Sequence, residues 1–381
     1  MDDAGPSGAR HRVAIRRLAL TDYRNYPELR LTLGPQPVVL TGANGAGKTN
    51  LLEALSYLAP GRGLRGASLD AVIRAGADAF AVAASVERGE AAVDVGTGFR
   101  RGESGREVRI DRQRARSVSA LGEIVRVLWL TPAMDGLFTG AAADRRRFLD
   151  RLVLTLDPGH AARVGEFEKL MRQRNRLLEE ARPDRRWLDA VEHELAGSAV
   201  ALAAARAEAV ARLSAALAGR AGGVFPDPAL ELVGTLENEL RAMPALDVEE
   251  NYRRALQAAR RRDAAAGRTL LGPHRSDLSV VHANRGVPAA IASTGEQKGL
   301  LIALVLAHAR IVAAADRGVA PLLLLDEVAA HLDDIRRAAL FGEILALGAQ
   351  AWMTGTDRLL FADIAADAQC FEVIDGRVSP L

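Results

Sequence analysis

The stretch Gly42-Ala43-Asn44-Gly45-Ala46-Gly47-Lys48-Thr49 fits the pattern G-x-x-x-x-G-K-[ST] and decides the fold. The apolar residues 37–41 before it predict a buried strand, and the leucine spacing in 50–58 predicts a helix. Glycines in such a loop let backbone amides converge on phosphate oxygens at a helix N-terminus. The stretch therefore predicts a nucleotide site, and a chance glycine-rich turn is the disfavoured alternative.

A second stretch supplies the carboxylates that such a site needs. Pro321-Leu322-Leu323-Leu324-Leu325-Asp326-Glu327 reads as an apolar strand that ends in two acids. Buried like charges are costly unless a cation offsets them, which favours a metal site. We expect Thr49 and Asp326 to hold Mg²⁺, Lys48 to reach the β- and γ-phosphates of ATP, and Glu327 to polarise the attacking water.

The spacing of these two stretches predicts an insertion. Lys48 and Asp326 are 278 positions apart (326 − 48), far more than one nucleotide-binding core requires. We expect an α/β head formed by residues 12–150 and 263–381, a helical arm at 157–262, and disorder at 1–11. Helical spacing in the arm predicts two antiparallel helices of roughly 24 and 36 residues, or about 35 and 55 Å, then a third, capped by Asp247, from 248 to about 266. A compact helical subdomain is the alternative to a two-helix arm.

The head is also expected to contain an antiparallel β subdomain. Residues 13–20 and 29–33 predict a hairpin, and alternation in 80–110 predicts a meander of strands. The hairpin turn, Asp22-Tyr23-Arg24-Asn25-Tyr26, lies close upstream of the phosphate loop. We expect Arg24, Asn25 and Asn50 to line the nucleotide, and an ordinary exposed turn is the alternative.

Composition limits the remaining functions. Net charge is +2, so a nucleic-acid surface must be a local patch of arginines. The candidates for contacts to DNA phosphates are Arg100, Arg101, Arg112, Arg114, Arg116, Arg253, Arg254 and Arg261. The meander turns also carry Arg106 and Arg109. A solvated arginine-rich face is the alternative.

Other features argue against several classes of protein. The single Cys370 excludes an internal disulfide and a C-x-x-C zinc site. The acidic, polar start does not read as a signal peptide. The longest apolar run, residues 300–307, is far short of a membrane span. These features predict a cytoplasmic protein with no membrane partner.

A further anion site is expected far downstream of the phosphate loop. Ser293-Thr294-Gly295-Glu296-Gln297-Lys298 precedes an apolar segment, 299–315, that reads as a long helix. Serine and glycine at a helix N-terminus favour an anion. Ala330-His331-Leu332-Asp333 then follows the acidic strand end, and Thr354-Gly355-Thr356-Asp357 follows another strand.

Together these motifs resemble the ABC-type ATPases and, more narrowly, the RecF family of recombination-mediator ATPases, related to the chromosome-condensation (SMC) group. The resemblance covers nearly the whole chain in order. Its narrower markers are Asp22 to Tyr26, Gly42 to Ala54, Arg145-Arg146-Arg147-Phe148-Leu149-Asp150, Gly272-Pro273-His274-Arg275-Ser276-Asp277-Leu278, Ser293 to Lys298, and Thr354 to Asp357. It implies an ABC-type head with a mixed sheet, an antiparallel β subdomain and an inserted coiled-coil-like arm.

The resemblance implies a mechanism as well. Ser293, Gly295, Glu296, Gln297 and Lys298 would face the nucleotide of a second subunit, so that ATP joins two heads around duplex or gapped DNA. The chain would be a weak, DNA-stimulated ATPase that acts as a switch in replication and recombinational repair. It would help load the recombinase onto single-stranded gaps, together with the mediators RecR and RecO.

Two departures from the ABC pattern bear on hydrolysis. The segment Pro132-Ala133-Met134-Asp135 lacks the glutamine that usually contacts Mg²⁺ and water there. The late histidine of transporter ATPases is also missing, which leaves Thr354 or Thr356 for the γ-phosphate. The alternative functions are an SMC-like chromosome-organising or break-processing ATPase, a transporter ATPase subunit, and a small-molecule kinase.

Overall fold

The computed structural model describes residues 13–89, 91–180, 184–219 and 223–381, so the segment 1–11 lies outside the described part. Contacts divide the chain into two compact units. The head unit comprises 1–135 and 301–381, and the inserted unit comprises 136–300. The inserted unit is longer at both ends than the expected arm, 157–262. Elements that come before and after the arm in the sequence pack with it and belong to the same unit.

A six-stranded sheet forms the centre of the head unit. Its order is β15-β14-β3-β13-β12-β8, and every neighbouring pair is parallel except β14 with β15. The strands are β3 (Val38–Thr41), β8 (Val127–Leu130), β12 (Leu322–Leu325), β13 (Ala351–Gly355), β14 (Gln369–Ile374) and β15 (Arg377–Pro380). Parallel strands end at one edge of a sheet, so the loops after β3, β12 and β13 meet there.

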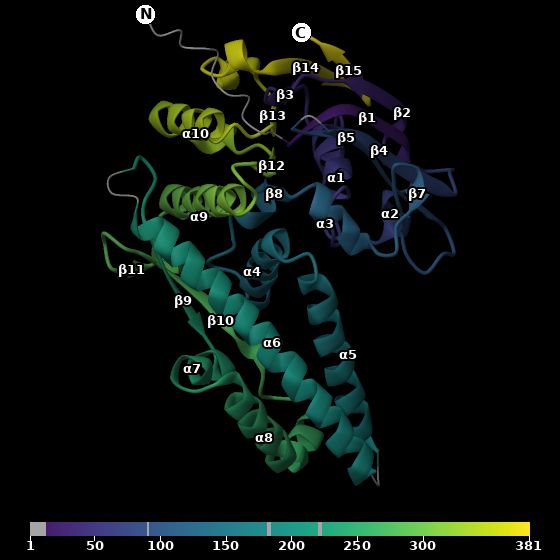
Figure 1. Ribbon diagram of the computed structural model, residues 1–381. Helices are drawn as coiled ribbons and strands as arrows, with labels where there is room; N and C mark the ends of the chain where they lie inside the picture. Colours follow the sequence, from purple (N-terminus) through teal and green to yellow (C-terminus); the bar gives the residue numbers. More distant parts are fainter. Residues whose placement is uncertain (1–12, 90, 181–183, 220–222) are drawn as a thin grey trace, which may run out of the picture. The chain divides into compact units, whose positions relative to one another are not determined.

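Helices cover this sheet on both faces (Figure 1). Alternate residues of a strand face opposite sides, and Val38, Leu40 and Trp352 share a core with helix α1 (Lys48–Ser56). That core also takes in apolar residues of the antiparallel sheet, so α1 is packed between the two sheets. Helices α9 (Thr294–Ala315) and α10 (Asp334–Leu347) lie on the other face.

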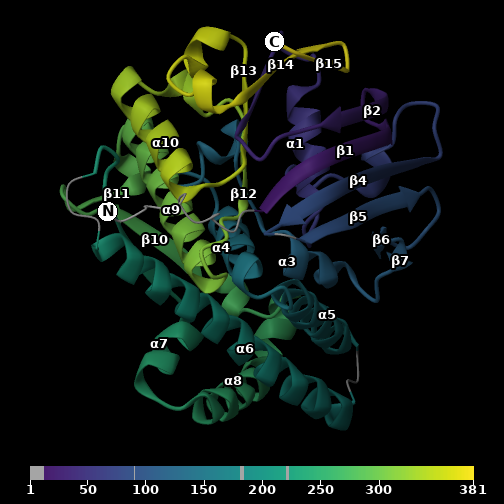
Figure 2. The same cartoon turned by 45° about the horizontal axis from the view of Figure 1, so that its top comes forward.

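The expected antiparallel subdomain is present in the head unit. Its order is β2-β1-β4-β5-β6-β7, and Figure 2 shows the strands in this order. They are β1 (Val13–Tyr23), β2 (Tyr26–Thr32), β4 (Ala79–Arg88), β5 (Ala91–Arg100), β6 (Glu107–Ile110) and β7 (Gln113–Arg114), with the short helices α2 (Leu69–Val72) and α3 (Leu121–Ile124) nearby in sequence. The hairpin is longer than expected, because Tyr23 pairs with Tyr26 and leaves a two-residue turn.

The inserted unit contains the expected pair of long helices, α5 (His160–Glu179) and α6 (Arg185–Ala218), side by side (Figure 1). Helix α8 (Ala245–Ala266) also packs on them, and α7 (Thr235–Ala242) joins the same core through Leu236. Asp247 is not the cap of α8, since the helix begins two residues earlier, after Pro244. The insertion is therefore more compact than two helices alone.

A small sheet was not expected inside the insertion. Strand β9 (Pro228–Val233) pairs antiparallel with β10 (Asp277–His282), which also pairs with β11 (Val287–Pro288). Helix α4 (Ala142–Leu156) packs against β10 and α6. These pairings join residues on both sides of the expected arm, and they explain why the inserted unit extends to 136 and 300.

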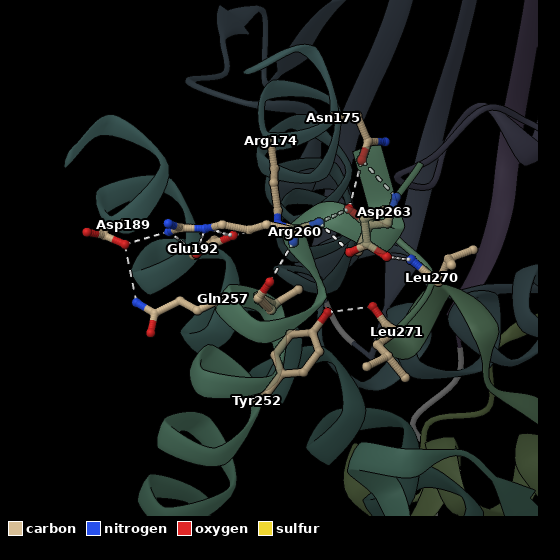
Figure 3. A network of polar contacts seen from close by, with 12 residues as sticks. Arg174, Asn175, Asp189, Glu192, Tyr252, Gln257, Arg260, Asp263, Leu270 and Leu271 are labelled. Atoms are coloured by element: carbon tan, nitrogen blue, oxygen red, sulfur yellow. Dashed lines mark hydrogen bonds and ion pairs between the residues drawn. The ribbon is translucent and has the colours of Figure 1, made fainter. Parts of the chain in front are cut away.

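A buried ionic network holds the helices of the inserted unit together (Figure 3). The Arg174 side chain on α5 is fully buried, and it donates to Glu192 on α6 at 2.9 Å and to Asp263 on α8 at 2.8 Å. It also donates to the Leu256 carbonyl and the Thr269 hydroxyl, both at 2.8 Å. Every guanidinium nitrogen is thus bonded to protein, so the buried charge is fully compensated.

Helix α9 is the one described helix that is long and apolar enough to cross a membrane. In its most apolar window 78% of the residues are buried inside the structure, as in the core helix of a globular protein.

We expect Arg174→Leu to lower the free energy of unfolding by about 3–5 kcal/mol, because it removes the cation that pairs with the buried Asp263 and leaves Glu192 with Arg260 alone. Arg172→Leu is the matched control on α5, since that side chain is 67% exposed and its ion pair with Glu168 is long. Its effect should stay within about 0.5 kcal/mol. Urea denaturation measures both, and equal losses would contradict the role of the network.

Candidate nucleotide site

The phosphate loop forms as the sequence predicts, between β3 and α1. Gly42, Gly45 and Gly47 have φ of 145°, 83° and 117°, a region that favours glycine. A β-carbon on Gly42 would lie 2.2 Å from the Val373 carbonyl oxygen. The glycines thus let the loop pass β14 closely and turn into α1, whose first backbone N–H groups are left to bind an anion.

Lys48 is buried and lies across the loop. Its ammonium donates to the carbonyls of Gly42 and Ala43, at 2.7 and 2.8 Å. Burial lowers the pKa of Lys48, and the charges of Glu327 and Asp326 oppose this shift. A triphosphate in the loop would compete with the two carbonyls for the ammonium.

The acidic strand end meets the loop at the edge of the central sheet. The Thr49 hydroxyl donates to Asp326 Oδ1 at 2.8 Å, across 277 residues of sequence. A carboxylate and a hydroxyl this close suit Mg²⁺, which prefers oxygen ligands and keeps several waters or phosphate oxygens. Among the described residues there is no group of three His, Cys, Asp or Glu side chains that could hold a metal by themselves. The two protein oxygens at Thr49 and Asp326 suit an ion that takes its other ligands from phosphate and water.

Thr354 shares the same carboxylate oxygen. Its hydroxyl donates to Asp326 Oδ1 at 2.8 Å and accepts from the Glu327 N–H at 2.9 Å. The Thr354 hydroxyl is therefore engaged by the Asp326 carboxylate and the Glu327 backbone, whereas we expected Thr354 or Thr356 to reach the γ-phosphate. Thr356 is exposed in the loop that follows.

The β1–β2 turn packs against the phosphate loop. The Tyr26 hydroxyl donates to the Gly47 carbonyl at 3.0 Å, and the Asn25 amide donates to the Ala46 carbonyl at 3.2 Å. Asn50 donates to the Asn25 side chain at 2.8 Å. Tyr26 is fully buried and Asn25 is exposed, so the turn is anchored on the phosphate loop while its tip stays open to solvent.

Arg24, which we expected at the nucleotide, is engaged by the protein. Its guanidinium makes two 2.9 Å bonds to Glu53 on α1 and one 2.8 Å bond to the Ala71 carbonyl. Glu53 is fully buried and also accepts from Arg65 at 3.0 Å. These bonds position α1, and a direct interaction of Arg24 with nucleotide stays a prediction. Glu53 and Tyr26 were missed as supporting residues, although both lie within the family markers.

Arg106 fixes the other end of α1. Its guanidinium donates to the carbonyls of Tyr57 and Ala59 and lies 5.3 Å from the centre of the Tyr57 ring. Burial lowers the pKa of Arg106 to about 10, and the interaction with Tyr57 opposes the shift. A cation at a helix C-terminus is favourable. Arg106 therefore does not belong to the exposed arginine patch in which the sequence placed it.

The candidate DNA contacts are divided between the two units. In the head unit, five exposed arginines follow or lie on the outer strands β5 to β7: Arg100, Arg101, Arg112, Arg114 and Arg116. In the inserted unit, Arg253 and Arg254 pair with Glu250 on the same helix, and Arg261 is exposed. These exposures suit phosphate contacts and equally suit a solvated face.

The expected signature segment belongs to the inserted unit and begins α9 with a capping box. Ser293 N–H donates to the Glu296 carboxylate at 2.9 Å, and the Ser293 hydroxyl donates to it at 2.8 Å. These bonds, with Arg285, lower the pKa of Glu296 to about 2. Gln297 donates to the Ala292 carbonyl at 2.9 Å, so this side chain and Glu296 shape the helix start.

Two of the narrower markers bind one another in the inserted unit. Arg145 donates two hydrogen bonds to the Asp277 carboxylate, at 2.7 and 2.8 Å. Arg206 makes a bidentate ion pair with Asp150 and also donates to the Pro273 carbonyl. The segments 145–150 and 272–278 thus have a structural reason to occur together.

Known proteins match the chain over most of its length. The family described as RecF/RecN/SMC N terminal domain matches residues 14–375. The DNA replication and repair protein RecF of Brucella abortus (strain 2308) is 55% identical over 374 residues, covering 97% of this chain and 96% of the relative. This chain belongs to the RecF family. RecF of Rhizobium meliloti (strain 1021) is 54% identical over 373 residues, covering 97% and 99%. Membership places the chain among the DNA replication and repair proteins that bear the RecF name.

Solved structures agree on the fold. One described as the recombination mediator protein RecF-ATPrS in the RecFOR pathway has a TM-score of 0.85 at 20% identity, covering 98% of this chain and all of that chain. An Smc head domain derived from Pyrococcus furiosus has a TM-score of 0.55 at 15% identity, covering 97% and 96%. The expected RecF membership and ABC-type fold class are confirmed.

We expect Gly42→Ala to lower the free energy of unfolding by roughly 2–4 kcal/mol, because strain at positive φ adds to the clash with Val373. Gly45→Ala is the matched substitution in the same loop, with positive φ but open space around a β-carbon. Its loss should be about 1–2 kcal/mol. Thermal unfolding without nucleotide compares them, and a larger loss at Gly45 would contradict this account of the loop.

Proposed function

We propose that this RecF-family protein is an ATP-dependent DNA-binding switch of DNA replication and recombinational repair. The observation that carries the proposal is the 2.8 Å hydrogen bond between Thr49 and Asp326 at the mouth of the phosphate loop. It brings together the two protein ligands that Mg²⁺·ATP requires. The names of the relatives, and a solved relative described in the RecFOR pathway, support the repair role.

The residues of the site divide the chemistry among them. The phosphate loop, residues 42–49, would bind the phosphates through backbone amides and Lys48. Mg²⁺ held at Thr49 and Asp326 would offset charge on the phosphate oxygens. Glu327 would then accept a proton from the attacking water. The missing glutamine near Pro132 is consistent with slow turnover.

ATP is proposed to act through a homodimer. Ser293 and Gly295 of one copy would contact the nucleotide held by another, as in the ABC-type ATPases that the chain resembles. Such a contact gives ATP a higher affinity for the dimer than for the monomer, and only differential affinity can shift an equilibrium. Hydrolysis removes that difference and resets the protein.

Duplex or gapped DNA is the proposed partner of the dimer, and the mediators RecR and RecO are the proposed protein partners. The exposed arginines at 100–116 would contact phosphates without reading bases. The SMC-like chromosome-organising function is the second candidate, supported by the likeness to the Smc head. The helices of the insertion disfavour it, since the longest helix among its described residues has 34 residues, far shorter than the long coiled coils of that group.

The dimer is tested by measuring mass in solution with ATP and Mg²⁺, with and without duplex DNA. We expect the parent to double its mass with ATP and Lys48→Ala to stay monomeric, because it loses the loop cation. Lys169→Ala, an exposed lysine on α5, is the control and should behave as the parent. A Lys48→Ala protein that still dimerises with ATP would defeat the proposal.

The DNA surface is tested through salt dependence. Replacing both Arg112 and Arg114 by Ala should reduce the slope of log affinity against log salt by about 0.9 for each DNA phosphate that these side chains neutralise. Arg30→Ala is the matched control, because Arg30 is exposed on β2, at the opposite edge of the same sheet. Equal slopes for the parent and the double variant would return these arginines to the solvated-face interpretation.

A further inference from the structure

We infer that Thr354 is a positioning residue that holds both Asp326 and Glu327 for hydrolysis, and that it is not a γ-phosphate ligand. This inference rests on the proposed ATPase function and deepens it. It concerns a side chain that the sequence pattern placed at the nucleotide and that the structure places behind the carboxylates.

The location of Thr354 makes it suited to this task. It lies near the carboxyl end of β13, whose neighbours are β3, leading to the phosphate loop, and β12, leading to the acids. Its side chain is buried, with 1% of the residue exposed. The next residue, Gly355, has no room for a β-carbon, which would lie 2.6 Å from the buried Phe361 ring. The backbone on which Thr354 sits is therefore tightly fixed.

The hydroxyl of Thr354 is fully used where it is. A threonine hydroxyl has one proton to donate. That proton is directed to Asp326 Oδ1 at 2.8 Å, and the hydroxyl oxygen accepts the Glu327 N–H at 2.9 Å. Donating to a phosphate would require breaking the bond to Asp326, whose Oδ1 also accepts from Thr49.

The backbone of Glu327 explains why an anchor is needed. Its φ is 52°, in the left-handed region that costs a non-glycine residue about 1–2 kcal/mol. Such conformations persist where the surroundings hold them, and they cluster at functional sites. Here the N–H of Glu327 is held by Thr354, so the hydroxyl fixes the direction in which the Glu327 side chain leaves the strand end.

Steady-state hydrolysis of ATP in the full chain tests this role. We expect Thr354→Val, which keeps the shape and removes the hydroxyl, to lower kcat by about tenfold to hundredfold, since small displacements of a catalytic group have such effects. The KM for ATP should change by less than about threefold, because the phosphate loop is untouched. Thr354→Ser, which keeps the hydroxyl, should restore kcat to within about threefold of the parent.

The matched control is Thr97→Val, which removes another buried threonine hydroxyl of the head unit, bonded to the Glu107 carbonyl at 3.1 Å. It should leave kcat unchanged. A Thr354→Val protein with parental kcat, or a Thr354→Ser protein as slow as Thr354→Val, overturns the inference. So does a raised KM with unchanged kcat, which would indicate a phosphate ligand.

A double-mutant cycle separates positioning from an independent effect. In a Glu327→Gln background, measured by single turnover, Thr354→Val should cost clearly less than it costs in the parent, because the share of its effect that passes through Glu327 is already lost and only the share through Asp326 remains. Losses that multiply in full overturn the inference. Should Thr354→Val fail to fold, Thr354→Cys takes its place: a weakly bonding thiol predicts an intermediate kcat, and a parental kcat contradicts the role.

The two proposals fail in different ways. A parent protein that does not hydrolyse ATP sinks the proposed function. A parent that does, with slow Glu327→Gln and parental Thr354→Val, leaves that function standing and removes only the role of Thr354.

Discussion

The hydrogen bond between Thr49 and Asp326 is the interaction on which the rest of the head depends. It joins the helix that follows the phosphate loop to the end of a strand 277 residues away. The parallel sheet makes it possible, because β3, β13 and β12 are consecutive neighbours and all end at one edge. Strands β8 and β12, which flank the insertion in sequence, are also neighbours. The chain can therefore leave the sheet after β8, form the whole inserted unit and return at β12 without changing the strand order.

The sequence predicted the parts of the site whose chemistry lies in consecutive residues. Glycines at 42, 45 and 47 can be understood without tertiary structure, since the loop needs their backbone freedom. The apolar run before Asp326 and Glu327 likewise indicates a buried strand, and it places the two acids at the carboxyl end of that strand. The resemblance to the RecF family indicated that these distant motifs belong to one ABC-type head. The comparisons confirmed the family and the fold.

What the sequence did not predict depends on register and packing. Arg101 and Arg106 lie on the same turn, yet Arg101 faces solvent and Arg106 is half-buried over Tyr57 against the end of α1. Thr354 was expected to reach the γ-phosphate, but the pairing of β13 with β12 places its hydroxyl between the Asp326 carboxylate and the Glu327 backbone N–H. The pairing of β9 with β10 moved the limits of the insertion, because strand partners distant in sequence carry no local signal.

The position of β3 has a consequence for how the chain is made. Both of its neighbours, β13 and β14, come from the far end of the sequence, and the Thr41 hydroxyl donates to the Phe371 carbonyl across 330 residues. At a synthesis rate of about 5–20 residues per second, the loop emerges from the ribosome many seconds before β13 and β14 are synthesised. A nascent or truncated chain would thus contain every residue of the phosphate motif and still lack the two strands that flank β3. The part of the sheet that frames the phosphate loop is therefore complete only at the last stage of translation.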